Sequence, residues 1–303
     1  MDYKKIRENA KQFQSVTSLS IEEFDALLPR FELVWRTFIY KFTLDGKPRK
    51  RKYVPKSLTG LNSIEDKLFF ILSYQKNNPL QEYHAATFGL TQDMCNKWIH
   101  LLSPLLNKTL DEFKASRKMQ DLNEHLVEGK TYIGDVTDRV IERPSEQQEE
   151  SYSGKKKLHV TKNFLLCCTC GFVLFLGQSV HGKVHDKKIA NQQLSFKKRI
   201  NLFLDLGFKG LTVANATITL PHKKPYKKEL TKIQKKENQL FSRDRIIIEN
   251  VIAHVKIMRI VKDKNRNRKD NFRDLVMDTS VRLHNYRVTK RRITLLPESF
   301  KIE

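Results

Sequence analysis

The sequence is short of cysteine, and this shortage excludes two classes of protein. Four cysteines occur in 303 residues, and three of them crowd together at Cys167, Cys168 and Cys170. They provide neither a disulfide framework nor the paired C-x-x-C spacing of a zinc site. We therefore interpret them as small buried strand residues in a reducing compartment.

Long apolar runs are also missing. The most apolar segment, 164–176, is interrupted by Thr169 and Gly171, which predicts two strands joined by a tight turn rather than a membrane span. The first residues, MDYKKIRENAKQFQ, lack the apolar core of a signal peptide. We therefore expect the protein to remain in the cytoplasm.

Acidic residues are scarce relative to basic ones. The chain has 57 Lys and Arg against 34 Asp and Glu, which gives a net charge of +23 and a pI of about 9.8. Such an excess favours a polyanionic partner, most commonly nucleic acid. An acidic membrane surface is the alternative, but no amphipathic helix with a long apolar face accompanies the charge.

Residues 1–60 predict a helical and basic N-terminal segment. Ser20 and Glu23 have the spacing of an S-x-x-E capping box, which opens a helix that Pro29 bends or divides. The basic stretch 45–56 follows, either as a solvated loop or as a contact to phosphates.

Residues 61–108 predict a helix-turn-helix domain. Three short helices are expected, at 64–75, at 80–88 and from Thr91 onward. The outer side of the third helix would place four polar residues against base edges or phosphates: Gln92, Asn96, Lys97 and His100. A plain helical bundle is the alternative. Residues 109–130 then form a helical connector.

From Thr131 onward the apolar pattern predicts an α/β domain that extends over 131–290, followed by a tail at 291–303. Strands are expected at 131–138, around Leu158 and Val160, and at 164–168, 172–176, 201–207 and 211–220, and helices at 185–194, 239–261 and 271–288. A mixed sheet flanked by helices in this order is expected of a ribonuclease H-like fold.

Three acidic residues occupy positions that such a fold could bring together. Asp135 lies in the first strand, where a carboxylate on a buried face is costly unless it is paired or binds a cation. Asp205 ends a later strand, and Glu249 lies within the long helix. Because two bridged hard cations stabilise both oxygens of a phosphodiester displacement, these acids predict a site for Mg²⁺ or Mn²⁺, with two ions. Asp186 is a rival acid, whose alternative role is to cap the helix that follows it.

The surroundings of these acids contain a series of further motifs. They are Asp135-Val136-Thr137-Asp138, Arg143-Pro144, Tyr152-Ser153-Gly154-Lys155-Lys156-Lys157 with His159, Gly182-Lys183-Val184-His185-Asp186-Lys187, Asp205-Leu206-Gly207-Phe208-Lys209-Gly210, Pro221-His222-Lys223-Lys224, and Arg245 with Glu249 and Lys256. In this joint order, over roughly 62–288, the chain resembles the DDE-type transposases of bacterial insertion sequences, in the group related to eukaryotic Harbinger elements. It departs from them at Ser242, where the family usually has Tyr, and at Phe208, which replaces another Tyr.

The resemblance implies roles for individual residues. Asp135, Asp205 and Glu249 would be the catalytic, metal-binding acids. Arg245 and Lys256 would lie on the same helix as Glu249 and hold phosphates of the transposon end. Lys155, Lys156 and Lys157 either contact DNA or line a solvated strand edge.

The resemblance also implies an activity. The protein would bind the ends of an insertion sequence as a homo-oligomer, cleave DNA with metal-activated water and join the freed 3′-hydroxyl to a double-stranded target, in association with the bacterial nucleoid. Two alternatives remain open. One is a catalytically silent DNA-binding protein derived from a transposase, and the other is a two-metal nuclease without strand transfer.

Overall fold

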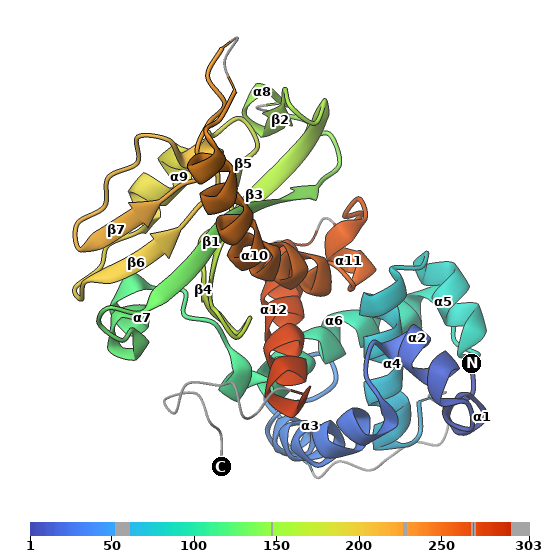
Figure 1. Cartoon of the computed structure of the whole chain (residues 1–303). Helices are drawn as coiled ribbons and strands as arrows, with labels where there is room; N and C mark the ends of the chain where they lie inside the picture. Colours follow the sequence, from blue (N-terminus) through green and yellow to red (C-terminus); the bar gives the residue numbers. More distant parts are fainter. Residues whose placement is uncertain (52–60, 147, 227–228, 268, 270, 292–303) are drawn as a thin grey trace. The chain divides into compact units, whose positions relative to one another are not determined.

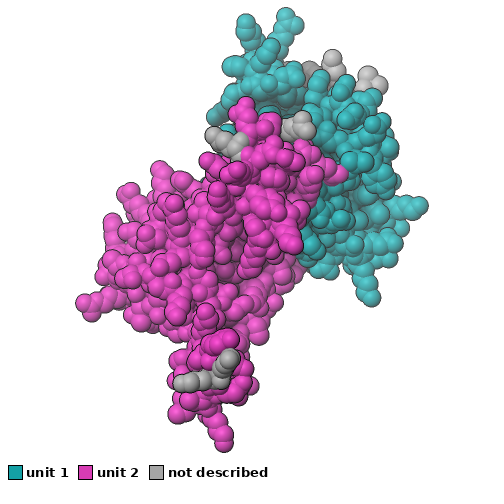
Figure 2. Space-filling view, turned by 90° about the horizontal axis from the view of Figure 1, so that it is seen from above, with its two compact units in different colours: residues 1–113, 256–263, 267–283 teal, residues 114–255, 264–266, 284–303 magenta. Residues whose placement is uncertain are grey.

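The computed structural model describes residues 1–51, 61–146, 148–226, 229–267, 269 and 271–291 (Figure 1). Contacts divide the chain into two compact units, which Figure 2 colours separately. The first unit contains 1–113, 256–263 and 267–283, and the second contains 114–255, 264–266 and the chain from His284 on. The end of the predicted basic loop, 52–56, and the predicted tail after Arg291 lie outside the described residues. None of the helices within the described ranges could span a bilayer, given their lengths and polarity.

The first unit is helical. Its elements are α1 (Tyr3–Arg7), α2 (Ala10–Thr17), α3 (Ile21–Lys41), α4 (Ile64–Asn77), α5 (Gln81–Thr87), α6 (Gln92–Thr109), the 3₁₀ turn η1 (Asp111–Phe113), α11 (Arg259–Lys262) and the first part of α12 (Phe272–Arg291). The predicted capping box opens α3: Ser20 Oγ accepts the N–H of Glu23 (3.2 Å), and the Glu23 carboxylate accepts the N–H of Ser20 (2.9 Å). Pro29 lies within α3 without dividing it.

Two tryptophan rings and a buried ammonium group occupy the interior of this unit. The Lys67 side chain donates to three backbone carbonyls of residues 61–63, at 2.7 to 3.3 Å. Its Nζ lies 5.2 Å from the centre of the Trp35 ring and 5.8 Å from that of Trp98, within the range of cation–π attraction. Burial lowers the pKa of Lys67 to about 8. Leu68, Ile71 and Leu72, which have the spacing of one face of α4, are all buried.

A buried histidine makes the first unit sensitive to acid. His84 is 3% exposed, packs against the rings of Phe70 and Phe88, and places Nε2 3.2 Å from the Phe70 carbonyl oxygen. Burial lowers the pKa of His84 from an ordinary 6.5 to about 4. Between these values the unfolded chain binds the proton more strongly, so acid favours unfolding. We expect the free energy of unfolding of this unit to fall as the pH drops from 6.5 to 4, by about 3 kcal/mol at most.

Urea unfolding followed by tryptophan fluorescence measures this effect in the right place, because both tryptophans, Trp35 and Trp98, belong to the first unit. The wild type should lose stability between pH 6.5 and 4, and a His84→Gln variant should have a flatter profile over the same range. An equally steep loss in the variant would show that other groups cause the acid sensitivity.

The last helix, α12, belongs to both units. Residues 272–283 complete the first unit: Asn107 on α6 donates to Asp278 (2.9 Å), and Arg282 donates to a carboxylate in η1 (2.9 Å). The following residues belong to the second unit, in which Asn285 accepts the N–H of the first residue of β4 (Val173–Leu176) at 2.8 Å and donates to its carbonyl at 2.9 Å.

The second unit is a mixed sheet flanked by helices. Its other elements are α7 (Met119–His125), β1 (Thr131–Val140), α8 (Gln148–Ser151), β2 (Tyr152–Ser153), β3 (Leu158–Cys168), β5 (Val180–His181), α9 (Asp186–Gln193), β6 (Ile200–Phe203), the 3₁₀ turn η2 (Leu206–Phe208), β7 (Ala216–Thr219) and α10 (Lys232–Val255). The strand order is β2-β3-β1-β6-β7, with β4 and β5 also paired to β3. β1 is antiparallel to β3 and parallel to β6, and β6 is parallel to β7. β3 is antiparallel to both β1 and β4, and the predicted mixed α/β class is confirmed.

The two faces of β1 have different neighbours. Tyr132 belongs to a large apolar core that also contains Phe164 of β3 and Ile189 of α9. Ile133 and Asp135 point to the opposite face, as the alternation in the sequence predicted. This second face is covered by α10, which crosses β1 in Figure 1.

The structure contradicts the sequence prediction at Lys256 and at two of the cysteines. α10 ends at Val255, so Lys256 lies in the turn after the helix and not on the same helix as Glu249. The chain leaves the helical path here because Met258 is fully buried in the first unit. The second error concerns Cys168 and Cys170, which form a disulfide across the turn after β3. The alternation expected of a continuous strand does not apply there, because β3 has already ended at Cys168.

Candidate active site

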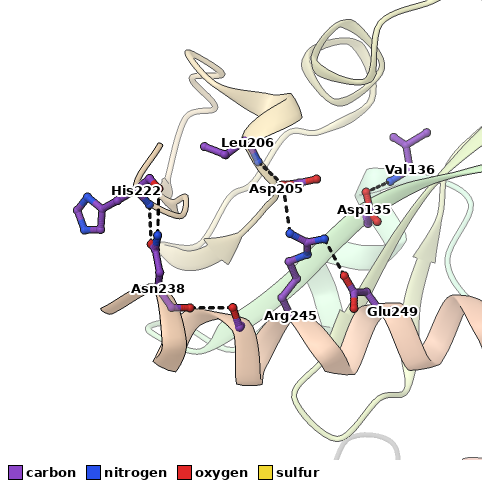
Figure 3. Close-up of polar contacts among 9 residues, drawn as sticks. Asp135, Val136, Asp205, Leu206, His222, Asn238, Arg245 and Glu249 are labelled. Carbon is purple, nitrogen blue, oxygen red and sulfur yellow. Dashed lines mark hydrogen bonds and ion pairs between the residues drawn. The ribbon is translucent and has the colours of Figure 1, made fainter. Parts of the chain in front are cut away.

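Parallel pairing of β1 with β6 places two of the predicted acids on neighbouring strands. Ile133 pairs with Phe203, and two residues further along each path come Asp135 and Asp205 (Figure 3). Asp205 has just left β6 and caps η2, where its Oδ1 accepts the N–H of Leu206 at 2.5 Å. The register of this strand pair therefore places Asp135 and Asp205 at corresponding positions on neighbouring segments of the chain.

Asp135 is the more buried of the two acids, and its surroundings disfavour its charge. Burial, together with the neighbouring charges of Asp205 and Asp186, raises the pKa of Asp135 to about 6. The N–H of Val136 donates to Oδ1 at 2.7 Å and opposes this shift, as does the positive charge of Arg245. Without a cation, a carboxylate in this position is protonated more readily than an exposed one.

The third acid comes from α10, whose apolar side holds it against the sheet. Phe241 packs its ring 5.4 Å from that of Phe203, and Ile248 is 1% exposed. Glu249 follows Ile248 and points away from the core, with half of its side chain exposed. The sheet and α10 enclose a small hollow, which is lined by Ile133, Gly134, Asp135, Phe203, Leu204, Asp205, Phe241, Arg245 and Ile248.

Arg245 links the second acid to the third. Its Nη2 donates to Glu249 Oε1 at 2.7 Å, one turn along α10, and its Nη1 donates to Asp205 Oδ1 at 3.4 Å (Figure 3). All three side chains are between 39% and 50% exposed. One guanidinium group thus neutralises two carboxylates at a surface open to water.

The rival acid, Asp186, lies near the same site. Its Oδ1 accepts a hydrogen bond from Lys162 Nζ at 2.9 Å, and this ammonium also donates to the Val184 carbonyl at 2.9 Å. His185, and not Asp186, caps α9, with Nδ1 accepting the N–H of Lys187 at 3.3 Å. The alternative role predicted for Asp186 was therefore wrong, while its charge still reaches Asp135.

A contact that the sequence did not reveal anchors the chain beside these acids. Asn238 Oδ1 accepts the N–H of His222 at 2.7 Å, and its Nδ2 donates to the His222 carbonyl at 3.0 Å. His222 Nε2 also lies 2.6 Å from a carboxylate oxygen of Glu237. The motif at 221–224 is thereby fastened to the first half of α10 (Figure 3). Asn238 has no signal of its own, since only the fold brings it to His222.

The donor set fits a divalent ion in its chemistry. Asp135, Asp205 and Glu249 offer only carboxylate oxygens, which suit hard cations such as Mg²⁺ and Mn²⁺. Over the part of the chain that the structure describes, however, no three His, Cys, Asp or Glu side chains approach closely enough to hold a metal ion. The guanidinium group of Arg245 stands between two of the donors.

The residues predicted to contact DNA from α6 differ in their exposure. Gln92 and Lys97 are exposed. Asn96 is half-buried and donates to Gln81 on α5 at 3.0 Å. His100 is also half-buried, packs edge-on against the Phe272 ring, and has its pKa lowered by this burial. Gln92 and Lys97 are therefore exposed to solvent, whereas Asn96 and His100 make contacts within the first unit.

The three consecutive lysines form an exposed turn between β2 and β3. The N–H groups of Lys156 and Lys157 both donate to the Ser153 carbonyl, at 3.2 and 2.7 Å, and Lys157 has a positive φ of 54°. Lys155, Lys156 and Lys157 are all exposed. The tight turn therefore presents three ammonium groups to solvent.

Comparisons with known proteins agree with the motifs at this site. Residues 135–285 match the family described as DDE superfamily endonuclease, and this range contains all three acids. Over 243 residues the chain is 27% identical to a protein of Microchaete diplosiphon named "Probable transposase for insertion sequence element IS702". The aligned region covers 78% of this chain and 85% of that relative. No solved structure matches the chain.

Proposed function

We propose that this chain, which belongs to the DDE-type transposases of insertion sequences, binds the ends of its element and uses Asp135, Asp205 and Glu249 to cleave them and to transfer the cut strand. The observation that carries this proposal is that Arg245 contacts both Asp205 and Glu249, while Asp135 lies on the strand paired with the one that leads to Asp205.

The chemistry of the donors supports a metal-dependent reaction. Asp135, Asp205 and Glu249 would hold Mg²⁺ or Mn²⁺, whose contribution is to activate the attacking oxygen and to stabilise the leaving one. The Leu206 N–H fixes the orientation of the Asp205 carboxylate, and the packing of Phe241 on Phe203 sets the height of α10 above the sheet. Arg245 supplies the positive charge nearest to these acids. We propose a ribonuclease H-like fold for the sheet unit on these grounds.

Binding of the element ends is assigned to the helical unit. α4, α5 and α6 follow one another with the short turn at 88–91 before the last helix, in which Gly89 has a positive φ of 65°. We propose a helix-turn-helix in which Gln92 and Lys97 contact DNA directly. Double-stranded DNA as the partner agrees with the net charge of +23 and with the three exposed lysines after β2.

The test uses the full chain and a duplex that carries the ends of its own element, incubated with a supercoiled target plasmid in Mg²⁺, in Mn²⁺ or in EDTA. We expect end cleavage and joined products only with a divalent ion, and only weak products with a duplex of scrambled ends. EDTA should reduce both products by at least about a thousandfold.

Two other outcomes would change the assignment. Cleavage without joined products in either metal would support a nuclease without strand transfer. Tight binding of the ends without any cleavage would leave a DNA-binding protein and would contradict the enzymatic role of the three acids.

A further inference from the structure

We infer that Arg245 is an internal counter-ion which excludes divalent metal from the acid site until a DNA phosphate displaces it. This inference rests on the proposed function, because it assumes that the three acids bind metal. In the absence of DNA, Arg245 would pair with the carboxylates of Asp205 and Glu249. When DNA binds, it would contact a phosphate instead.

The first argument is that Arg245 and a metal ion compete for the same two carboxylates. The guanidinium group contacts Asp205 Oδ1 and Glu249 Oε1, at 3.4 and 2.7 Å. A cation bound between these carboxylates would share their charge with Arg245, and two positive groups at one site repel each other. Arg245 therefore opposes the entry of a metal ion, and its departure favours entry.

The second argument concerns charge in the metal-free protein. Four carboxylates gather here, and Lys162 pairs with only one of them, Asp186. Carboxylates that share a site without a cation raise one another's proton affinity and repel. Arg245 relieves this repulsion for Asp205 and Glu249 and so stabilises the empty site.

The third argument is that Arg245 is exposed enough to exchange its carboxylate partners for a DNA phosphate. Its side chain is 39% exposed, and it lines the hollow between α10 and the sheet. A planar guanidinium fork matches a phosphate as well as a carboxylate. A backbone phosphate of DNA can thus draw Arg245 outward and free the acids, so that DNA binding and metal binding strengthen each other.

Mn²⁺ binding by the full chain without DNA, measured by electron paramagnetic resonance, tests the competition directly. We expect Arg245→Gln to bind Mn²⁺ roughly five- to tenfold more tightly than the wild type, the range expected from the loss of two partly exposed ion pairs. Arg245→Lys keeps the charge but cannot hold both carboxylates in a fork, and should lie between the two. Arg243→Gln removes the same charge from an exposed position on α10 and should change the affinity less than twofold.

A second measurement tests the role of phosphate. The affinity for a fluorescein-labelled duplex is compared in EDTA and in Ca²⁺, a hard cation with a preference for oxygen ligands. Ca²⁺ should strengthen duplex binding more in the wild type and in Arg243→Gln than in Arg245→Gln.

Three results would overturn the inference. Mn²⁺ binding that is equal or weaker in both Arg245 variants, each checked for a native melting curve, would show that Arg245 helps to assemble the metal site. An equal effect of Ca²⁺ on duplex binding in all variants would remove the role of phosphate. Mn²⁺ binding unaffected by Asp205→Asn and Glu249→Gln would place the metal elsewhere, and would contradict the proposed function together with the inference.

Discussion

Replacing Asp135 by Asn is expected to reduce DNA cleavage by at least about a thousandfold, because it removes one of the three charged donors that we propose to hold the metal. Asp205→Asn and Glu249→Gln should have effects of similar size. Asp186→Asn should reduce the rate to a smaller extent, since the carboxylate of Asp186 is already engaged by Lys162. Cleavage of duplexes with element ends, measured in Mn²⁺, compares the four variants.

The same Asp135→Asn substitution should stabilise the metal-free protein. The pKa of Asp135 is about 6 in the folded chain and near 3.8 without its surroundings, so the folded state prefers the protonated acid. The carboxylate therefore destabilises the fold increasingly from pH 3.8 to 6, and constantly above that. Asparagine removes this penalty, and we expect a gain of about 2 kcal/mol at pH 7.5 in EDTA.

The pH dependence separates this mechanism from a general improvement in packing. Urea unfolding should show that the gain from Asp135→Asn shrinks as the pH falls toward 4, where the wild-type carboxyl group is protonated in the folded state. Asp244→Asn, on α10 outside the group of four acids, serves as the control and should leave stability nearly unchanged at both pH values. A destabilised Asp135→Asn protein at pH 7.5 would contradict the burial of an unfavourable charge.

Gly134→Val is expected to lower the free energy of unfolding of the sheet unit by about 3 kcal/mol or more, the upper range for overpacking a filled core. A Cβ atom at Gly134 would lie 2.6 Å from Cζ of Phe164 and 3.0 Å from Cδ2 of Leu204. Both side chains are at most 1% exposed, so neither can move aside without disturbing its neighbours. Gly134→Ala should have a smaller effect of the same sign.

Hydrogen exchange of peptides from β1 and β3, followed by mass spectrometry, reports this loss within the second unit. Gly154→Ala provides the matched control, since a Cβ atom there would meet nothing within 4 Å. If exchange in β1 and β3 were as slow in Gly134→Val as in Gly154→Ala, the close approach of β1 to Phe164 and Leu204 would not be a constraint on the fold.

Local signals in the sequence predicted much of the fold. The capping box at Ser20, the alternation around Asp135 and the apolar spacing of α4 each depend on neighbours a few residues away, and each is confirmed. The ends of α10 were not predicted, because they depend on distant parts of the chain. The helix stops where Met258 becomes buried in another unit, and no nearby residue signals this.

The candidate site divides in the same way. Residue types and the known motifs selected Asp135, Asp205 and Glu249 as candidates, and their catalytic role stays a prediction. The contact between Arg245 and Glu249 follows from their spacing of four residues on one helix. The contact between Arg245 and Asp205 depends on the order of the strands, which places β6 beside β1. The two hydrogen bonds between His222 and Asn238 likewise form only because the fold brings these two segments together.

The shared helix α12 has a consequence for how the protein is made. The first unit needs residues 267–283 to complete its contacts at Asn107 and η1, and these residues leave the ribosome only after the whole of 114–255 has been synthesised. A nascent or prematurely terminated chain therefore carries α6 and η1 without the helix that completes their contacts. A copy of the gene interrupted before α12 would then encode a first unit that is less stable than that of the intact protein.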